Sequence, residues 1–220
     1  MKTDIKSDLD LRSDIEEELR WDSTIDARKI GVAVIDGVVH LTGEVPTYTD
    51  KWRAERAVDR VEGVRGVAND IEVVLLTSEH TDTDIAKRAA NKLDWNLTVP
   101  RGAVSVKVDN GWITLKGEVP FDYQRRAAER VVRDIPGVKG VTNLITLKPS
   151  VASTNIRADI EKAFKRQAEL DANNIIIDVT GSTVRLRGSV RSWAERRDAE
   201  RIAWSAPGVT MVNNEIRVSG

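Results

Sequence analysis

The sequence predicts an α+β protein of three tandem domains, each with the element order α-β-β-α-β. One stretch occurs three times, and its central glycine, Gly43, Gly117 or Gly188, recurs with periods of 74 and 71 residues. Periods of this length indicate a duplicated domain, because solenoid repeats are about 20 to 50 residues long. Within each copy the hydrophobic spacing changes from helical to alternating, which separates helices from strands. The expected domains are residues 1–77, 78–148 and 149–220.

Each copy begins with a pattern typical of an amphipathic helix followed by a hairpin. In the second copy Ile85, Ala89 and Leu93 recur at i, i+4 and i+8, which places one apolar stripe along a helix. Alternating valines then predict a half-buried strand. The pair Asn110-Gly111 favours a tight turn into a second strand. We therefore expect a helix packed on a hairpin at the start of every domain.

A second helix and a last strand complete each copy. The buried face of this helix carries small residues, such as Ala128 in the second copy, which lets the helix lie close to the sheet. Glu55, Glu129 and Glu200 are expected on the exposed helix face, each paired with a basic residue four positions earlier. A hairpin followed by a helical crossover makes the third strand parallel to the second. Each domain is therefore predicted to be a small mixed three-stranded sheet with two helices on one face.

Two sets of glycines recur and are expected to shape the backbone. The glycines expected to turn the chain between the hairpin and the second helix are Gly43, Gly117 and Gly188. Those expected to end the second helix as left-handed caps are Gly63, Gly137 and Gly208. We interpret both sets as folding positions and not as a binding site.

The composition excludes several classes of protein. The chain has no cysteine, which excludes disulfides, thiolate metal sites and thiol nucleophiles. No run approaches the roughly 18 apolar residues of a membrane-spanning helix, and acidic residues interrupt the place of a secretory signal. We therefore expect a soluble, cytoplasmic protein.

The net charge of −1 hides an asymmetry between the copies. The three expected domains carry net charges of −6, +3 and +2. This difference favours head-to-tail contacts between domains or attraction to an anionic surface, and ordinary solvated faces of mixed sign also explain it. The isoelectric point of about 6.2 argues against nucleic acid as a partner.

The motifs of the three copies resemble a known family. The helix motif Ala-Glu-Arg occurs in all three, and the copies end in GVRGVANDI, GVKGVTNLI and GVTMVNNEI. With this element order, the chain is similar to three BON domains, a family named from bacterial osmotic-stress and nodulation proteins. The resemblance implies a stress-associated, non-enzymatic binding module without a cofactor. It also implies phospholipid or polysaccharide as ligands and, as in some cytoplasmic members, potassium.

The sequence offers no catalytic or metal-binding set. His40 lies on the outward side of a strand and His80 in a linker, so neither has the second partner that acid-base catalysis or a zinc site requires. No glycine-rich loop joins a strand to a helix in the way that a phosphate-binding loop does. We therefore expect no enzymatic activity.

One polar residue recurs on the inward side of the last strand, as Asn69, Asn143 and Asn214. A buried amide needs hydrogen-bond partners. Each asparagine is expected to tie its strand to a turn or a helix end. The alternative is a site for a cation such as K⁺, made of these amides and of backbone carbonyls.

Tryptophan and arginine residues form the candidate surface for a ligand. Six tryptophans against two phenylalanines is an unusual balance, and several tryptophans fall off the predicted core stripes. Exposed indoles beside arginines suit an anionic lipid surface or a protein partner. The candidate residues are Trp52, Trp112, Trp193, Trp204, Arg125, Arg126, Arg130, Arg196 and Arg197, and Arg133 and Arg201 are expected nearby. The alternative, which we favour, is that these tryptophans pack one domain against another and bury the open sheet faces.

Two functions follow from these patterns. The first is a non-enzymatic protein that binds anionic phospholipid surfaces or a cation such as potassium through tandem BON domains. The second is a structural scaffold for protein-protein interactions with no small ligand.

Overall fold

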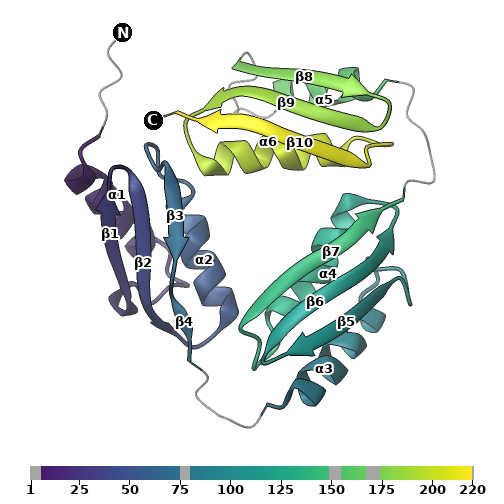
Figure 1. The fold of residues 1–220 in the computed structure, drawn as a ribbon, viewed down its shortest axis with the longest axis horizontal. Coiled ribbons are helices and arrows are strands. Elements are labelled where there is room, and N and C mark those ends of the chain that lie inside the picture. The colour runs from purple at the N-terminus through teal and green to yellow at the C-terminus, as the bar shows by residue number, and fades with distance from the viewer. Residues whose placement is uncertain (1–5, 75–79, 149–154, 167–173, 220) are drawn as a thin grey trace.

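The chain folds into three α+β units with the same order of elements. The computed structural model describes residues 6–74, 80–148, 155–166 and 174–219. Figure 1 shows the three sheets as the sides of a triangle, with the second helix of the first and third units on the inner side. The predicted fold class is therefore confirmed.

Each unit contains a first helix, a hairpin, a second helix and a last strand. The first unit contains α1 (Asp8–Trp21), a 3-10 turn η1 (Ala27–Lys29), β1 (Ile30–Ile35), β2 (Val38–Val45), α2 (Tyr48–Val58), β3 (Gly66–Asn69) and β4 (Glu72–Val73). The second contains α3 (Asp82–Trp95), β5 (Val104–Asp109), β6 (Trp112–Val119), α4 (Asp122–Arg133) and β7 (Gly140–Leu147). The third contains α5 (Ile156–Arg166), β8 (Ile175–Thr180), β9 (Thr183–Val190), α6 (Trp193–Ser205) and β10 (Met211–Val218).

In every unit the second strand lies in the middle of the sheet. It pairs antiparallel with the first strand and parallel with the last, which gives the orders β1-β2-β3, β5-β6-β7 and β8-β9-β10. In the first unit β3 and β4 share the place of the last strand, and both pair with β2. The sheets are mixed as predicted, because the helical crossover carries the chain back to the same end of the sheet.

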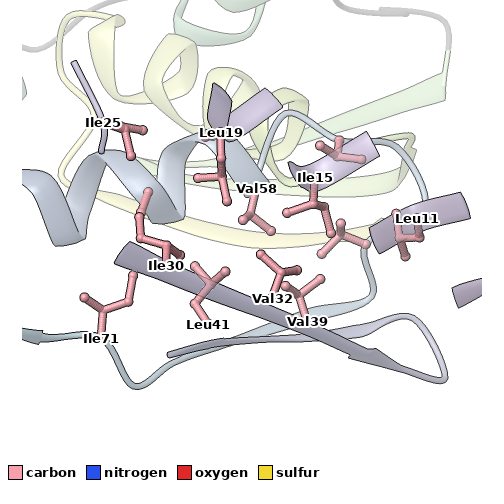
Figure 2. Close-up of a cluster of buried hydrophobic side chains, with 14 of the residues drawn as sticks. Leu11, Ile15, Leu19, Ile25, Ile30, Val32, Val39, Leu41, Val58 and Ile71 are labelled. Carbon is pink, nitrogen blue, oxygen red and sulfur yellow. The ribbon is translucent and has the colours of Figure 1, made fainter. Parts of the chain in front are cut away.

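Both helices of a unit cover the same face of its sheet. Figure 2 shows this core in the first unit, where Leu11 and Ile15 of α1 face Val39 and Leu41 of β2. All four side chains are at most 1% exposed. Burying one such side chain stabilises the fold by roughly 1.5–3 kcal/mol. The alternating strand pattern therefore directs one face of each sheet to a core of its own.

The first set of recurring glycines lies inside strands, so the prediction that these glycines turn the chain is wrong. Gly43, Gly117 and Gly188 belong to β2, β6 and β9 and have φ angles of +123°, +151° and +129°. A Cβ atom at these positions would lie 1.9–2.0 Å from a backbone carbonyl oxygen at the start of the neighbouring strand. Close approach between two strands therefore requires glycine here. The turn glycines of the first two hairpins are Gly37 and Gly111.

The second set of glycines lies beyond the helix ends. Helices α2, α4 and α6 end at Val58, Arg133 and Ser205, before Gly63, Gly137 and Gly208. Tight turns with hydrogen bonds between residues three apart separate each helix from its glycine. The predicted caps are therefore corrected to loop positions, which still use a left-handed φ of +88° to +96°.

Candidate functional site

The second helices of the three units meet head to tail around a common centre. The start of α2 lies at the end of α4, where the Thr49 hydroxyl donates a hydrogen bond to Asp134. The start of α6 lies at the end of α2, where the Ala194 N–H donates to the Asp59 carbonyl at 2.8 Å. Arg125, near the start of α4, stacks on Trp204, near the end of α6, at 4.4 Å. The three contacts close a ring of helices.

The junction between α6 and α2 is built on Trp193. Its indole Nε1 donates a hydrogen bond to the carbonyl of Val64 at 3.0 Å, and its ring packs against the core of the first unit. An ion pair between Arg197 and Asp59 adds to this junction. Arg191 also approaches Glu62, at 3.5 Å. A tryptophan that lies off the core of its own unit is thus partly buried by another unit.

The junction between α2 and α4 is built on two aromatic rings of the first unit. Tyr48 packs against the core of the second unit. Burial raises the pKa of the Tyr48 phenol, and the nearby Glu129 carboxylate raises it further. Trp52 lies under the guanidinium of Arg133, 3.8 Å from the ring centre.

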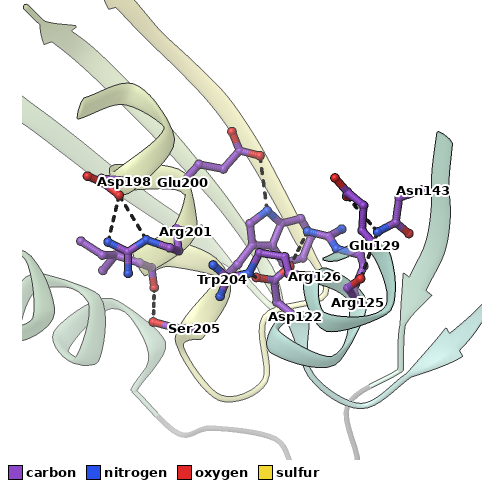
Figure 3. A network of polar contacts seen from close by, with 11 residues as sticks. Asp122, Arg125, Arg126, Glu129, Asn143, Asp198, Glu200, Arg201, Trp204 and Ser205 are labelled. Atoms are coloured by element: carbon purple, nitrogen blue, oxygen red, sulfur yellow. Dashed lines mark hydrogen bonds and ion pairs between the residues drawn. The ribbon is translucent and has the colours of Figure 1, made fainter. Parts of the chain in front are cut away.

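The junction between α4 and α6 joins an arginine to a tryptophan. Figure 3 shows Arg125 lying beside the Trp204 indole, which is held by a hydrogen bond from its Nε1 to Glu200 at 3.4 Å. Arg125 also donates to Asp122 at 2.5 Å, which orients its guanidinium toward the indole.

Equivalent positions of the repeat carry different residues at the three junctions. Asp59, Arg133 and Trp204 each lie sixteen residues after the central glycine of their copy. Arg197, the partner of Asp59, and Trp52, the partner of Arg133, each lie nine residues after the central glycine of their copy. Arg125, the partner of Trp204, lies eight residues after it. Each junction therefore uses the same part of the helix with a pair of its own.

The three helices line a cavity of about 580 Å³ that is open to solvent and rich in arginine. Its walls hold seven arginines against four carboxylates, which leaves a net charge of +3. The lining residues are Trp52, Arg56, Asp122, Arg125, Arg126, Glu129, Arg130, Arg133, Arg197, Asp198, Glu200, Arg201 and Trp204. Arginine stays protonated at neutral pH, so the cavity is positively charged.

Among the residues that the structure describes, several arginines at the cavity share one carboxylate with another arginine. Asp59, just outside the wall, pairs with both Arg56, at 3.2 Å, and Arg197. Asp122, which is 2% exposed, is shared by Arg125 at 2.5 Å and Arg126 at 2.7 Å. These shared carboxylates leave positive charge uncompensated.

The positive charges are also partly desolvated. Burial lowers the pKa of Arg56. Burial, followed by the neighbouring charge of Arg56, lowers the pKa of Arg197 to about 10. The buried Nε atoms of Arg56 and Arg133 have no hydrogen-bond acceptor within the described part of the chain. Anionic oxygens entering the cavity would therefore meet donors with unused capacity.

The structure brings together part of the predicted surface. Trp52, Trp204, Arg125, Arg126, Arg130 and Arg197 line the cavity. Trp193 lies at a junction, and Arg196 binds the last strand through the carbonyls of Asn214 and Ile216 at 2.7 and 2.9 Å. Trp112 lies on the outer face of its sheet, is 49% exposed and donates to Thr142 at 2.8 Å. These nine residues therefore do not form one continuous surface.

Sequence reasoning missed three charged residues of this cavity, Arg56, Asp122 and Asp198. Arg56 belongs to the repeated Ala-Glu-Arg motif, whereas Asp122 lies on α4 and Asp198 on α6. The motif was a usable signal, because its arginine falls thirteen residues after the central glycine in every copy. Equivalent arginines of the three units line one cavity.

The recurring asparagines tie the last strand to the second helix. The Asn143 side-chain N–H groups donate to the Arg125 carbonyl at 3.0 Å and to Glu129 at 3.2 Å, while its oxygen accepts from the Ile145 N–H at 3.2 Å. Asn69 and Asn214 make the equivalent bonds. The glutamates predicted to pair along the exposed helix face instead accept these bonds, because they point toward the sheet.

The histidines lie apart from the cavity. The His40 Nε2 atom is 2.7 Å from Asp70 on the outer face of the first sheet. His80 lines a separate pocket of about 490 Å³ between the first and second units. The residues that the structure describes hold no group of three or more His, Cys, Asp or Glu side chains arranged for a metal ion. None of the described helices has the length and hydrophobicity that a bilayer crossing needs.

Comparison with known proteins gives related sequences. Osmotically-inducible protein Y of Escherichia coli (strain K12) is 28% identical over 122 residues, which are 52% of this chain and 61% of that protein. The match thus spans less than two thirds of the E. coli protein. A 21 kDa hemolysin of Actinobacillus pleuropneumoniae is 29% identical over 139 residues, 60% of this chain and 71% of that protein.

The structural comparison adds little, but the family is clear. A solved structure of CdsD, a structural protein of the Type III secretion system of Chlamydia trachomatis, aligns with 96% of this chain and 92% of its own. Its identity of 16% and TM-score of 0.26 carry no argument about arrangement or function. The family model of the BON domain matches residues 7–74, 81–149 and 152–220. The chain therefore belongs to the BON domain family and contains three tandem copies of the domain.

Proposed function

We propose that the protein is a non-enzymatic, stress-associated binding protein whose central cavity binds the phosphate groups of anionic phospholipids. The observation that carries this proposal is the excess of seven arginines over four carboxylates in one cavity. The stress association rests on the BON family and on the similarity to a protein named as osmotically inducible.

Phosphate is the favoured group because of the chemistry of arginine. The guanidinium presents a planar fork of donors that matches two oxygens of a phosphate. Arg130 lines the cavity, is exposed, and has no hydrogen-bond or ion-pair partner among the described residues. It is therefore free to bind a ligand without breaking an existing contact.

The tryptophans have a different role from the one a membrane-inserting surface requires. Trp52, Trp193 and Trp204 are partly buried where the units meet. Binding to a lipid surface would therefore depend on charge and on access of single headgroups to the cavity. Such binding weakens as salt screens the charges.

The cytoplasm is the location that we propose. The cytoplasmic leaflet of a membrane carries a negative surface potential that attracts arginine and lysine side chains near the surface. An arginine-rich cavity suits that leaflet. Cell fractionation tests the location, and recovery of the protein outside the cytoplasmic and membrane fractions would contradict it.

Potassium binding through the recurring asparagines has less support. In each unit the amide N–H groups donate to the helix and the amide oxygen accepts a backbone N–H. The amides are thus engaged by the fold itself. A specific K⁺ ligand would raise the melting temperature in K⁺ relative to Na⁺ by mass action, and equal melting temperatures would remove this alternative.

The scaffold function has one specific observation in its favour. The outer face of the second sheet exposes Trp112 and Leu144, at 49% and 51%. A protein partner that covered this face would bury both side chains. Loss of a co-purifying partner in Trp112→Ala, with lipid binding unchanged, would favour the scaffold over the lipid function for this face.

Sedimentation with vesicles tests the lipid proposal. Wild-type protein is expected to sediment with vesicles that contain phosphatidylglycerol at low salt and to remain in solution at high salt. Arg130→Gln should weaken the association. Arg217→Gln is the matched control, because Arg217 is exposed and lies on β10, outside the cavity. Absence of sedimentation at low salt, or equal loss in both variants, would contradict the proposal.

A further inference from the structure

We propose that the central cavity is one composite site that takes a single small molecule with several phosphate groups, and that this ligand holds the three domains closed. The inference rests on the proposed function in one respect only, which is the preference of the cavity for phosphate. It adds that the ligand carries several phosphate groups, that one ligand binds per chain, and that binding stabilises the closed ring of helices.

The arginine donors of the cavity come from three different units. Arg56, Arg130 and Arg201 lie on α2, α4 and α6, at equivalent positions of the repeat, and all three line the cavity. They approach the centre from three different units. A single phosphate also has oxygens in several directions, but it is small beside a cavity of about 580 Å³, and a ligand with several phosphates fills more of the space between the three helices. The donor set therefore favours a multivalent ligand.

The ion pairs at the cavity leave an excess of positive charge. Asp59 and Asp122 each serve two arginines, and Arg130 has no partner within the described ranges. The net charge of the cavity is +3. Like charges in a partly desolvated space repel one another. A polyanion offsets several of these charges at once.

The volume of the cavity suits a small molecule. Small-molecule sites commonly have volumes of about 300–1,000 Å³. The central cavity, at about 580 Å³, falls within that range. It accommodates a triphosphate group or a similarly compact polyanion, and a lipid would enter it with its headgroup alone.

Closure of the ring and occupancy of the site are coupled. The cavity exists only while α2, α4 and α6 lie together, because each helix supplies part of the wall. A ligand that binds only the closed arrangement stabilises it by mass action. Repulsion between the unoccupied arginines acts in the opposite direction, since Arg56 and Arg197 share one carboxylate across a junction. The site thus connects ligand concentration to the assembly of the domains.

Calorimetric titration of the full chain with inorganic tripolyphosphate tests the inference. We expect one binding site per chain, with inorganic phosphate binding far more weakly at the same salt concentration. Loss of a charged hydrogen bond weakens binding by roughly ten- to a hundredfold. We expect that decrease in Arg56→Gln, Arg130→Gln and Arg201→Gln, and no change in Arg217→Gln. Three equal sites per chain, or unchanged affinity in Arg130→Gln, would overturn the inference.

Two further arms separate this inference from the proposed function. Vesicles that contain phosphatidylglycerol are measured beside tripolyphosphate, with circular dichroism as a check that each variant folds. Vesicle binding that depends on Arg130, without tripolyphosphate binding, would refute the composite site and leave the proposed function standing. Tripolyphosphate binding without vesicle binding would refute the proposed function and leave the composite site standing. Arg130 is exposed and unpaired in the described structure, so its variant keeps the test decisive even if Arg56→Gln fails to fold.

Discussion

The interiors of the three units are alike, whereas the junctions between the units differ from one another. Leu41, Leu115 and Leu186 are fully buried at equivalent positions. The bonds from the three asparagines to their glutamates are 3.1, 3.2 and 3.1 Å long. At the junctions, by contrast, equivalent positions carry an aspartate, an arginine and a tryptophan. The interior contacts are thus repeated in every unit, while each junction uses a different pair of residues.

This difference has a physical reason. Identical head-to-tail surfaces would allow any unit to pair with any other, within one chain or between chains. Different pairs at each junction specify which neighbour fits, because a mismatched unit would place like charges or unpaired groups together. The repeated residues therefore build the domains, and the divergent residues determine their order in the ring.

The largest effect is expected from a change inside one repeated unit. In Gly117→Ala the new Cβ atom would lie 1.9 Å from the carbonyl oxygen of Ala103, at a φ of +151°. The two strands must separate, so we expect the second unit to lose about 3 kcal/mol or more of stability. Gly66→Ala is the control, because its Cβ would meet only Val38, at 3.9 Å. Equal urea midpoints for both variants would show that close strand approach is not what requires glycine.

A smaller effect is expected from the tie between strand and helix. Asn214→Ala removes the donor to Glu200 and the acceptor for the Ile216 N–H. Leaving partly buried polar groups unpaired costs roughly 1–3 kcal/mol. The neighbouring Asn213 lies on the same strand and provides a matched control. Chemical unfolding of the two variants measures the difference, and an equally large loss in Asn213→Ala would argue against the tie.

The smallest effect is expected at a junction and depends on pH. The pKa of Tyr48 is raised in the folded protein from its ordinary value of 10.0, mainly by burial. The unfolded chain therefore loses this proton first, and the stability that the neutral phenol provides decreases as pH rises above about 10. The free-energy difference between wild type and Tyr48→Phe should shrink from pH 8 to pH 11.

The control for this prediction is a second tyrosine. Tyr123→Phe removes a hydroxyl from a side chain that is 53% exposed. Urea unfolding of the wild type and both variants at several pH values gives the comparison. A difference between wild type and Tyr48→Phe that stays constant with pH would contradict burial of the phenol between the first and second units.

Most of the fold could be predicted because local patterns encode it. Alternating residues such as Val39 and Leu41 identify the inward strand face, and three copies in one register fix the element order. The inward position of Asn143 was also predictable from strand parity, and so was its role as a tie. The glycine within the strand was misplaced, since a close approach between strands and a turn both favour glycine in sequence.

The site was predicted only in part because it depends on how the units are placed. Trp193 lies off the core stripe of its own helix, which is compatible with exposure or with packing against another domain and does not identify the partner. Its partner, Val64, belongs to another unit 129 residues away along the chain. Arg56 and Arg201 likewise line one cavity only where α2, α4 and α6 converge. No spacing within one repeat contains that information.

A junction variant that leaves the cavity residues intact tests the central claim most directly. Trp193 lies outside the cavity wall, yet its indole holds α6 against the first unit through the bond to Val64. In Trp193→Ala we expect the units to stay folded by circular dichroism and the affinity for tripolyphosphate to fall at least tenfold. Trp112→Ala, on an outer sheet face, should bind as wild type does. Unchanged affinity in Trp193→Ala would contradict a site that requires the closed ring.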